Sequence, residues 1–410
     1  MALQLSHITK RVVTALACLF VTALYAADSR PTPEVFSLSR KDLVAARERV
    51  AQHDPALQPA LTSLCAEADK LLKQKPWSVM DKSRTPPSGD KHDYYTLAPY
   101  FWPNPKSADG LPYVRRDGEL NPESKEGTDA KAFWEMGEAV ETLGLAYFFT
   151  GHEAYAEKAA ALVRTWFIDP ASRMNPHLKY AQAVRGVNDG RGTGILESRH
   201  VVEATDGVAL LIGSIAWKTG DQKALLAWLD SYYRWITESK NGRDERAAKN
   251  NHGTWYDAQV VHFALVLGLK AEAQQIAHAA LASRIAAQIE PDGRQPLEIA
   301  RTKSFDYCCF NLEAWLQLAR ASGHADIDMW VFTTPDGRGL SAALRFMAPF
   351  SDPAKPWIKK DLETDPRARL LPFLAEALSH SDDPLIRTKF SQFADNQTRN
   401  ARWRLLYNVP

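Results

Sequence analysis

Asn250, Asn251 and His252 stand side by side in the sequence, and two aromatic residues follow at positions 255 and 256. The next residues, 260–267, are almost wholly apolar, with His262 the one polar exception. This pattern predicts a buried helix that carries amides and an imidazole at one end. Burying such groups without partners costs about 1–3 kcal/mol. The side chains at 250–252 are therefore expected to face a ligand.

A second polar cluster at 301–307 offers an arginine and a tyrosine. Arg301 has the geometry to bind a carboxylate in a bidentate pair, and Tyr307 supplies a phenol. If Ser304 caps a helix, Tyr307 lies in its first turn, where the helix dipole favours a phenolate. A phenol has a pKa of about 10, and a cationic neighbour is expected to help it ionise.

A glycine-rich stretch at 190–200 contains Arg191, Arg199 and His200. No Gly-Lys-Ser/Thr ends it, and it lacks the strand and spacing of a dinucleotide fingerprint, so it is not predicted to bind nucleotides. The three basic side chains are candidate contacts for an anionic ligand, with structural ion pairing as the alternative. Glu197 would repel such a ligand if it were exposed, so we expect it to pair with an arginine.

Helices are expected to position these groups. Helical periodicity covers most of the chain from Ser39, which begins a capping-box pattern with Asp42. Short Gly, Pro or Asp turns separate the helices, which favours antiparallel hairpins. No fixed-period repeat supports a simple solenoid. We therefore expect an all-α fold, an α/α toroid built as an incomplete barrel of antiparallel helix hairpins. The expected helices span about 39–50, 57–73, 130–150, 153–168, 200–219, 222–239, 252–267, 270–289, 305–322, 340–348, 367–380 and 385–397.

Residues 76–128 interrupt this pattern with a stretch rich in Pro, Gly, Asp and aromatic residues. Such a long non-helical segment in a compact domain is typically functional or disordered, and its aromatic content argues against disorder. We expect this aromatic loop to cover the cleft as a lid or tunnel roof. Its candidate sugar-stacking residues are Tyr94, Tyr95, Tyr100 and Trp102. Packing of the loop on the helices as a hydrophobic belt is the alternative.

Composition narrows the class further. A net charge of +1 over 410 residues produces no overall electrostatic field that would attract nucleic acid. Residues 1–26 read as a secretory signal peptide, with basic Lys10 and Arg11, an apolar core and small residues near the cleavage site; an uncleaved anchor is the alternative. Residues 27–410 are expected to form one domain that is periplasmic or secreted and does not associate with a membrane once the signal is removed. Oligomeric state remains open.

The cysteines and acidic residues point to no metal site. After loss of the signal the cysteines are Cys65, Cys308 and Cys309, an odd number that suits packing residues. No Cys, His, Asp or Glu cluster has convincing metal-ligand spacing. No cofactor is predicted.

The run at 98–105, Ala-Pro-Tyr-Phe-Trp-Pro-Asn-Pro, the Asn250-Asn251-His252 run and the later Arg301 and Tyr307 together resemble the alginate lyase superfamily of polysaccharide lyases. The resemblance spans about residues 36–380. It implies an α/α toroid and β-elimination on an acidic polysaccharide. Within this superfamily, the sequence is similar to the branch that acts on alginate, especially polymannuronate, or on β-1,4-glucuronan.

The resemblance also implies roles. β-Elimination needs a neutralised carboxylate, a base for the C5 proton and an acid for the departing O4. In mannuronate and glucuronate both groups lie on one face, so Tyr307 could act as base and then acid. Asn251 and Arg301 would neutralise the carboxylate, and His252 would face either the carboxylate or the C5 proton. Candidate substrate-binding residues are Arg191, Arg199, His200, Tyr95, Tyr100, Trp102 and Tyr256.

Each role has a structural alternative. Tyr307 could be a packed aromatic at a helix start, His252 a core histidine, Asn251 a helix N-cap and Arg301 part of a surface ion pair. Two other functions also stay open. A glycoside hydrolase on the same fold would need two facing carboxylates, for which Glu197 and Asp306 are the candidates, and a non-catalytic glycan-binding protein would not need Tyr307.

Overall fold

The computed structural model describes residues 31–360, 367–394 and 398–408, and Pro33–Pro410 forms one compact unit. The segment 1–26, expected to be a signal peptide, lies outside the described residues, so that expectation stays a prediction. No helix among the described residues combines the length and apolar character needed to cross a membrane.

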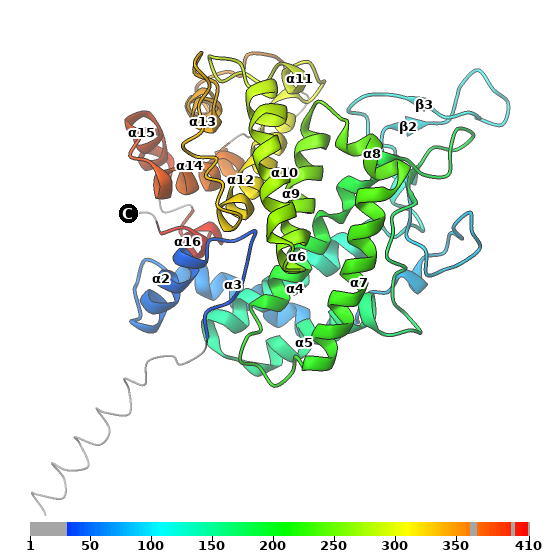
Figure 1. Ribbon diagram of the computed structural model, residues 1–410, viewed down its shortest axis with the longest axis horizontal. Coiled ribbons are helices and arrows are strands. Elements are labelled where there is room, and N and C mark those ends of the chain that lie inside the picture. Colours follow the sequence, from blue (N-terminus) through cyan, green and yellow to red (C-terminus); the bar gives the residue numbers. More distant parts are fainter. Residues whose placement is uncertain (1–30, 361–366, 395–397, 409–410) are drawn as a thin grey trace, which may run out of the picture. The chain divides into compact units, whose positions relative to one another are not determined.

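The described chain is mostly helical, as expected from its periodicity (Figure 1). Its α-helices are α2 (Arg40–Ala51), α3 (Gln58–Leu72), α4 (Ala130–Thr150), α5 (Glu153–Val163), α6 (Arg199–Ala209), α7 (Thr219–Glu238), α8 (Lys240–Arg246), α9 (Asn251–Val266), α10 (Lys270–Ala280), α11 (Pro296–Ile299), α12 (Ser304–His324), α13 (Leu340–Met347), α14 (Arg367–His380), α15 (Pro384–Phe393) and α16 (Trp403–Leu406). Short 3₁₀ helices are η1 (Val79–Asp81), η2 (Pro122–Lys125), η4 (Gly192–Ser198) and η6 (Ala348–Ser351), and π-helical turns are η3 (Arg164–Ile168) and η5 (Leu281–Ala286).

Consecutive helices pack on each other as hairpins. α4 packs on α5 and α6, α9 packs on α10 and α12, and α14 packs on α15. Because the connections between α4 and α5 and between α9 and α10 span only two or three residues, these neighbours run antiparallel. The arrangement is the incomplete α/α toroid that the sequence predicted.

Helix α9 lies at the centre of the packing because it is apolar on nearly every face. Of its residues from Gly253 to Leu265, all are buried. A helix that is hydrophobic all round is stable only when other helices surround it, and α6, α7, α8, α10 and α12 do so. Its first turn borders the cavity, where Asn251 and His252 stand.

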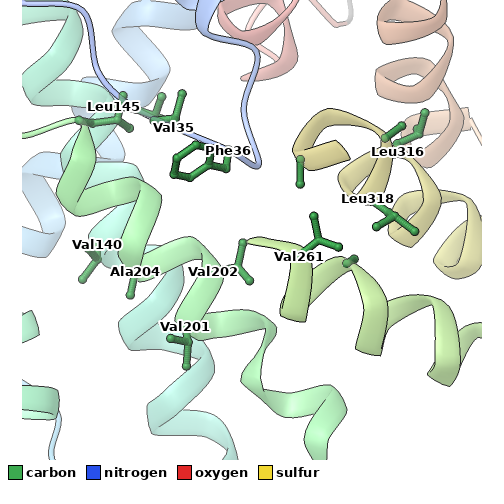
Figure 2. Packing of buried hydrophobic residues seen from close by; sticks show 14 of the residues in the cluster. Val35, Phe36, Val140, Leu145, Val201, Val202, Ala204, Val261, Leu316 and Leu318 are labelled. Carbon is green, nitrogen blue, oxygen red and sulfur yellow. The ribbon is translucent and has the colours of Figure 1, made fainter. Parts of the chain in front are cut away.

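The hydrophobic core joins α4, α6, α9 and α12 (Figure 2). Val35 and Phe36, which precede α2, insert between these helices. The backbone N–H groups of Phe36 and Ser37 donate to the buried carboxylate of Asp206 on α6, at 3.1 Å and 2.6 Å. The N-terminal segment is therefore held by apolar packing and by charge-assisted hydrogen bonds.

Helices α4 and α6 approach each other closely through glycines. A Cβ atom on Gly144 would lie 2.5 Å from the carbonyl oxygen of Gly207, and one on Gly207 would lie 2.8 Å from the backbone of Val140. Any larger residue would push the helices apart. This contact fixes the position of α6, and therefore of Arg199 and His200 at its start.

One expected helix is too long. The pattern predicted a helix over 200–219, but α6 ends at Ala209. Gly213 has a φ of +86°, which continues no right-handed helix, and Ile215 is 84% exposed. The apolar spacing at 210–217 therefore mimicked a helix face that does not exist.

The aromatic loop is ordered and contains short strands, where the sequence showed little strand pattern. Strand β1 (Tyr95–Leu97) pairs in parallel with β4 (Tyr180–Ala183), and β2 (Phe101–Trp102) pairs antiparallel with β3 (Val114–Arg115). A buried ion pair between Lys82 and Asp129, at 3.1 Å, ties together the two ends of the loop. Burial raises the pKa of Asp129 to about 7 against the opposing effect of Lys82.

The three cysteines among the described residues lie where packing residues are expected. Cys308 and Cys309 are buried in the core on α12, and Cys65 on α3 is partly buried.

Candidate active site

A cavity of about 1050 Å³ opens between the aromatic loop, η4, the start of α9 and the start of α12. This volume is at the upper end of the range for small-molecule pockets. Eight of the eleven candidate residues line it. They are Tyr100, Arg191, Arg199, His200, Asn251, His252, Arg301 and Tyr307.

Asn251 enters the cavity as the first residue of α9. Asn250 occupies the N-cap position in an extended conformation, which resolves which of the two asparagines starts the helix. The backbone N–H and the side-chain Nδ2 of Asn251 both donate to the carboxylate of Glu298, at 2.7 Å and 2.8 Å. Its Oδ1 is buried and has no hydrogen-bond partner among the described residues. A buried polar atom left in this state favours a ligand group as its partner.

His252 has a carboxylate partner of its own. Its Nδ1 lies 2.6 Å from Oε1 of Glu245, a buried residue of α8. A carboxylate accepts a hydrogen bond, so this contact places a proton on Nδ1 and leaves Nε2 for a ligand. Glu245 and Glu298 therefore orient the two residues of the Asn-His pair from two different helices. The sequence reasoning missed both carboxylates because nothing in their local pattern sets them apart from ordinary surface acids.

Tyr307 stands in the first turn of α12, as expected, although Ser304 is the first helical residue rather than the cap. Its hydroxyl donates to the hydroxyl of Tyr100 from the aromatic loop, at 3.1 Å. The guanidinium carbon of Arg301 lies 3.7 Å from the centre of its ring.

Arg301 lowers the pKa of Tyr307, as expected of a cationic neighbour, but other contributions outweigh it. Burial raises that pKa above its usual value, and the hydrogen bond with Tyr100 adds to the effect, whereas Arg301 only partly opposes it. Tyr307 therefore rests as a phenol.

Arg301 is paired with the aromatic loop rather than free to bind a ligand on every side. Its Nη2 and Nε donate to the carboxylate of Asp117, at 2.7 Å and 3.1 Å. These hydrogen bonds lower the pKa of Asp117 to about 2. The loop therefore reaches the 301–307 segment through Asp117 and through Tyr100, and the sequence had pointed only to Tyr100.

Arg191 and Arg199 line the cavity and form no ion pair with any described residue, which sets aside the alternative of structural ion pairing. Arg191 donates to the side-chain oxygen of Gln182 at 2.9 Å and lies 5.0 Å from the ring centre of Phe101. Arg199 makes a long contact with the carbonyl of Leu196, at 3.4 Å. Their charge is available to an anionic ligand.

His200 lies at the cavity wall but is buried. Its Nδ1 is 2.8 Å from the carboxyl of Glu203. Burial lowers the pKa of His200 well below its usual value and raises that of Glu203 to about 7. The pair is therefore close to neutral, so His200 offers a hydrogen-bonding group rather than a positive charge.

Glu197 lines the cavity, but the expectation that it pairs with an arginine is wrong. Its Oε2 accepts hydrogen bonds from the hydroxyls of Tyr94 and Thr96, at 2.9 Å and 2.8 Å. Burial raises its pKa, which lessens the negative charge toward a ligand. Asp306, the other carboxyl that a hydrolase would recruit, accepts from Arg369 at 3.0 Å.

Three candidate residues do not line the cavity. Tyr256 is buried one turn deeper in α9 and donates its hydroxyl to the carbonyl of Ile236, at 3.2 Å. Tyr95 begins β1 and directly follows Tyr94, which does line the cavity; successive side chains of an extended chain alternate, so Tyr95 faces the other side.

Trp102 also points away. Its indole N–H donates to the carbonyl of Glu119 at 3.0 Å, and the guanidinium of Arg116 lies 5.2 Å from its ring. It packs within the loop, and its neighbours Tyr100 and Phe101 take the cavity side. The expected contact of Trp102 with substrate is therefore corrected.

Known proteins resemble this chain in sequence and fold. The family model for alginate lyases matches residues 78–357. An alginate lyase from Bacteroides ovatus is 36% identical in sequence and superposes with a TM-score of 0.87, covering 92% of this chain and 100% of that chain. A search of curated proteins found no match.

More distant structures show the same fold. Alginate lyase A1-III from Sphingomonas species A1 is 15% identical with a TM-score of 0.58, covering 91% of this chain and 95% of that chain. A histidine-to-alanine variant of A1-III in complex with a tetrasaccharide is 15% identical with a TM-score of 0.58, covering 94% of this chain and 98% of that chain.

The helical toroid, together with the family match and the similar alginate lyase structure, defines a polysaccharide lyase. The chain belongs to the alginate lyase family. The hydrolase and the non-catalytic glycan-binding protein, both open on the sequence, are set aside by this membership.

Proposed function

We propose that this protein cleaves 1,4-linked uronate polymers, alginate rich in mannuronate or β-1,4-glucuronan, by metal-independent syn β-elimination. The observation that carries the proposal is the convergence of Tyr307, Arg301, Asn251 and His252 on one cavity. The tetrasaccharide complexes of A1-III variants support an acidic polysaccharide as the substrate class.

The substrate carboxylate is neutralised at the start of α9. Asn251 has a second Nδ2 hydrogen beyond the one that Glu298 accepts, and His252 presents Nε2. Donors that are held in place before the reaction stabilise the charge that develops on the carboxylate as C5 loses its proton. Arg301 adds positive charge beside the same atoms through the N–H groups that Asp117 does not use.

Tyr307 then carries the proton. Because Tyr307 rests as a phenol, the reacting form is the fraction that has lost its proton to solvent. This phenolate oxygen removes the proton from C5, and the electrons of the C5–H bond form the C4–C5 double bond. The C4–O4 bond breaks, and the Tyr307 phenol returns that same proton to O4. Tyr307 ends each turnover as a phenolate, and the guanidinium at 3.7 Å from its ring stabilises that form.

Replacement of the phenol tests this role directly. Tyr307→Phe keeps the ring beside Arg301 and removes only the hydroxyl, so it should lower kcat by about 10²–10⁴-fold with little change in melting temperature. Product is followed by the ultraviolet absorbance of the unsaturated uronate, which a hydrolase would not create. Full turnover by Tyr307→Phe would refute the proposal, as would a loss of wild-type activity in chelator that calcium restores.

We also propose that the protein is periplasmic or secreted and is processed near Ala27. The support is the order of basic, apolar and small residues in 1–26. Mass spectrometry of the exported protein should find a mature N-terminus near residue 27. A chain that still starts at Met1 would contradict it.

A further inference from the structure

The cavity has an aromatic wall that the chemistry above does not use. Trp134 lines it and is 46% exposed, although most tryptophans are largely buried. Leu120, at the end of the aromatic loop, lines the same part and is 45% exposed. Exposed apolar side chains gathered in a cavity mark a binding surface.

Helix α4 sets the direction of Trp134. Its neighbours Phe133 and Met136 are fully buried, and Gly137 packs against the backbone and side chain of His200 on α6. Because this face of α4 is fixed in the core, the side chain of Trp134, the residue after Phe133, projects from the neighbouring face into the cavity. The indole is therefore held by a rigid helix rather than by a loop.

Trp134 stands on a different wall from the reacting groups. The main packing partners of α4 are α3, α5 and α6, whereas Asn251 and Tyr307 start α9 and α12, which pack on each other. A ligand that reaches from Tyr307 to Trp134 must therefore cross the cavity, as a polymer of several sugar rings would.

Positive charge accompanies the aromatic wall. Lys125 and Lys131 line the same cavity as Trp134, and Lys131 precedes Trp134 by three residues on α4. Lys131 pairs with Glu135 one turn along α4, and its side chain stays 64% exposed. Lys125 forms no ion pair with any residue that the structure describes. The wall thus offers a flat apolar face and two ammonium groups.

We infer that Trp134, Leu120, Lys125 and Lys131 form a distal subsite for a uronate residue remote from the bond that is cleaved. One face of a pyranose ring carries mainly C–H bonds and stacks on the indole by dispersion and apolar burial. The carboxylate at the ring edge pairs with lysine ammonium groups. The inference rests on the proposed function, which supplies the polymer.

Chain length separates this subsite from the catalytic centre. In wild-type protein, kcat/KM should rise from the shortest cleaved oligosaccharide to the hexasaccharide and the polymer. Trp134→Ala should reduce that ratio of long to short substrate about 10-fold, mainly through KM, and Trp134→Phe should retain most of it. An unchanged ratio in Trp134→Ala, or an equal loss on every chain length, would overturn the subsite.

Trp102→Ala is the matched control, because it removes the same kind of side chain from a position in the aromatic loop that does not line the cavity. It should leave the ratio of long to short substrate as in the wild type. If Trp102→Ala reduced the ratio as much as Trp134→Ala, the ratio would report disturbance of the loop, and the subsite would be wrong.

A binding measurement separates failure of the subsite from failure of the proposed reaction. A uronate hexasaccharide is titrated calorimetrically into Tyr307→Phe protein with and without Trp134→Ala. The second change should weaken Kd about 10-fold, and an unchanged Kd would overturn the subsite whatever the reaction. Absence of unsaturated product from every uronate polymer with wild-type protein would instead refute the proposed function.

Discussion

The two sides of the active-site cavity are built differently. On one side Asn251 and Tyr307 stand at the starts of two long, buried helices, and buried carboxylates hold the Asn-His pair. On the other side the aromatic loop reaches the same groups through side-chain contacts of Tyr100 and Asp117. The helices position the proposed reacting groups, and the loop contacts them. Changes on the helical side should therefore act on chemistry, and changes on the loop side should act on access and binding.

The strongest test of the helical side removes its donors. Asn251→Ala and His252→Ala should each lower kcat about 10²–10³-fold, because a donor positioned before the reaction is lost at the carboxylate. The melting temperature should change far less than the activity, which calorimetry checks alongside the kinetics. Parallel losses of folding and activity would instead make these residues structural.

A smaller effect is expected at the carboxylates behind these donors. Glu245→Gln and Glu298→Gln keep the shape of the side chain but weaken the hydrogen bonds to His252 and Asn251, which should cost about 10–100-fold in kcat, as for other residues that orient a reacting group. Glu245→Gln should also alter the pH profile, because Nδ1 of His252 loses its charged partner. A KM change with kcat and the pH profile untouched would contradict a positioning role.

The pH profile sharpens the role of Tyr307. Burial raises the pKa of its phenol above the usual value of about 10. Below that pKa the phenolate fraction increases about tenfold per pH unit, so kcat/KM should rise as the pH increases from neutral toward alkaline values. A rate that stays flat or falls over this range would argue against phenolate as the base.

The smallest effects are expected on the loop side. Asp117→Asn removes the charge that pairs with Arg301 and should raise KM several-fold while kcat changes less. Glu119→Gln, an exposed change in the same loop whose partner is Arg116 rather than Arg301, is the matched control. A fall in kcat as large as that of His252→Ala would show that the loop takes part in the chemistry.

The difference between the helical side and the loop side of the cavity also explains how much of the fold and the site could be predicted from the sequence. Polar residues at the end of an all-apolar helix are unusual, so Asn251 and His252 stood out, and the periodicity of the helices predicted the toroid. Trp102 and Trp134 look alike in sequence, but only the packing of α4 and the folding of the loop decide which one faces the cavity. Glu245 and Glu298 acquire their roles through contacts between separate helices, which no local pattern encodes.

The central claim is that one phenol serves both C5–H and O4, and the linkage that is cleaved tests it most directly. Initial rates of unsaturated product are measured on polymannuronate, β-1,4-glucuronan, polyguluronate and hyaluronan after treatment with chelator. The account predicts cleavage of polymannuronate or glucuronan, whose C5 hydrogen and O4 share a face, and far slower cleavage of polyguluronate. Preferential cleavage of polyguluronate would contradict it, because those groups then lie on opposite faces and Tyr307 alone could not reach both.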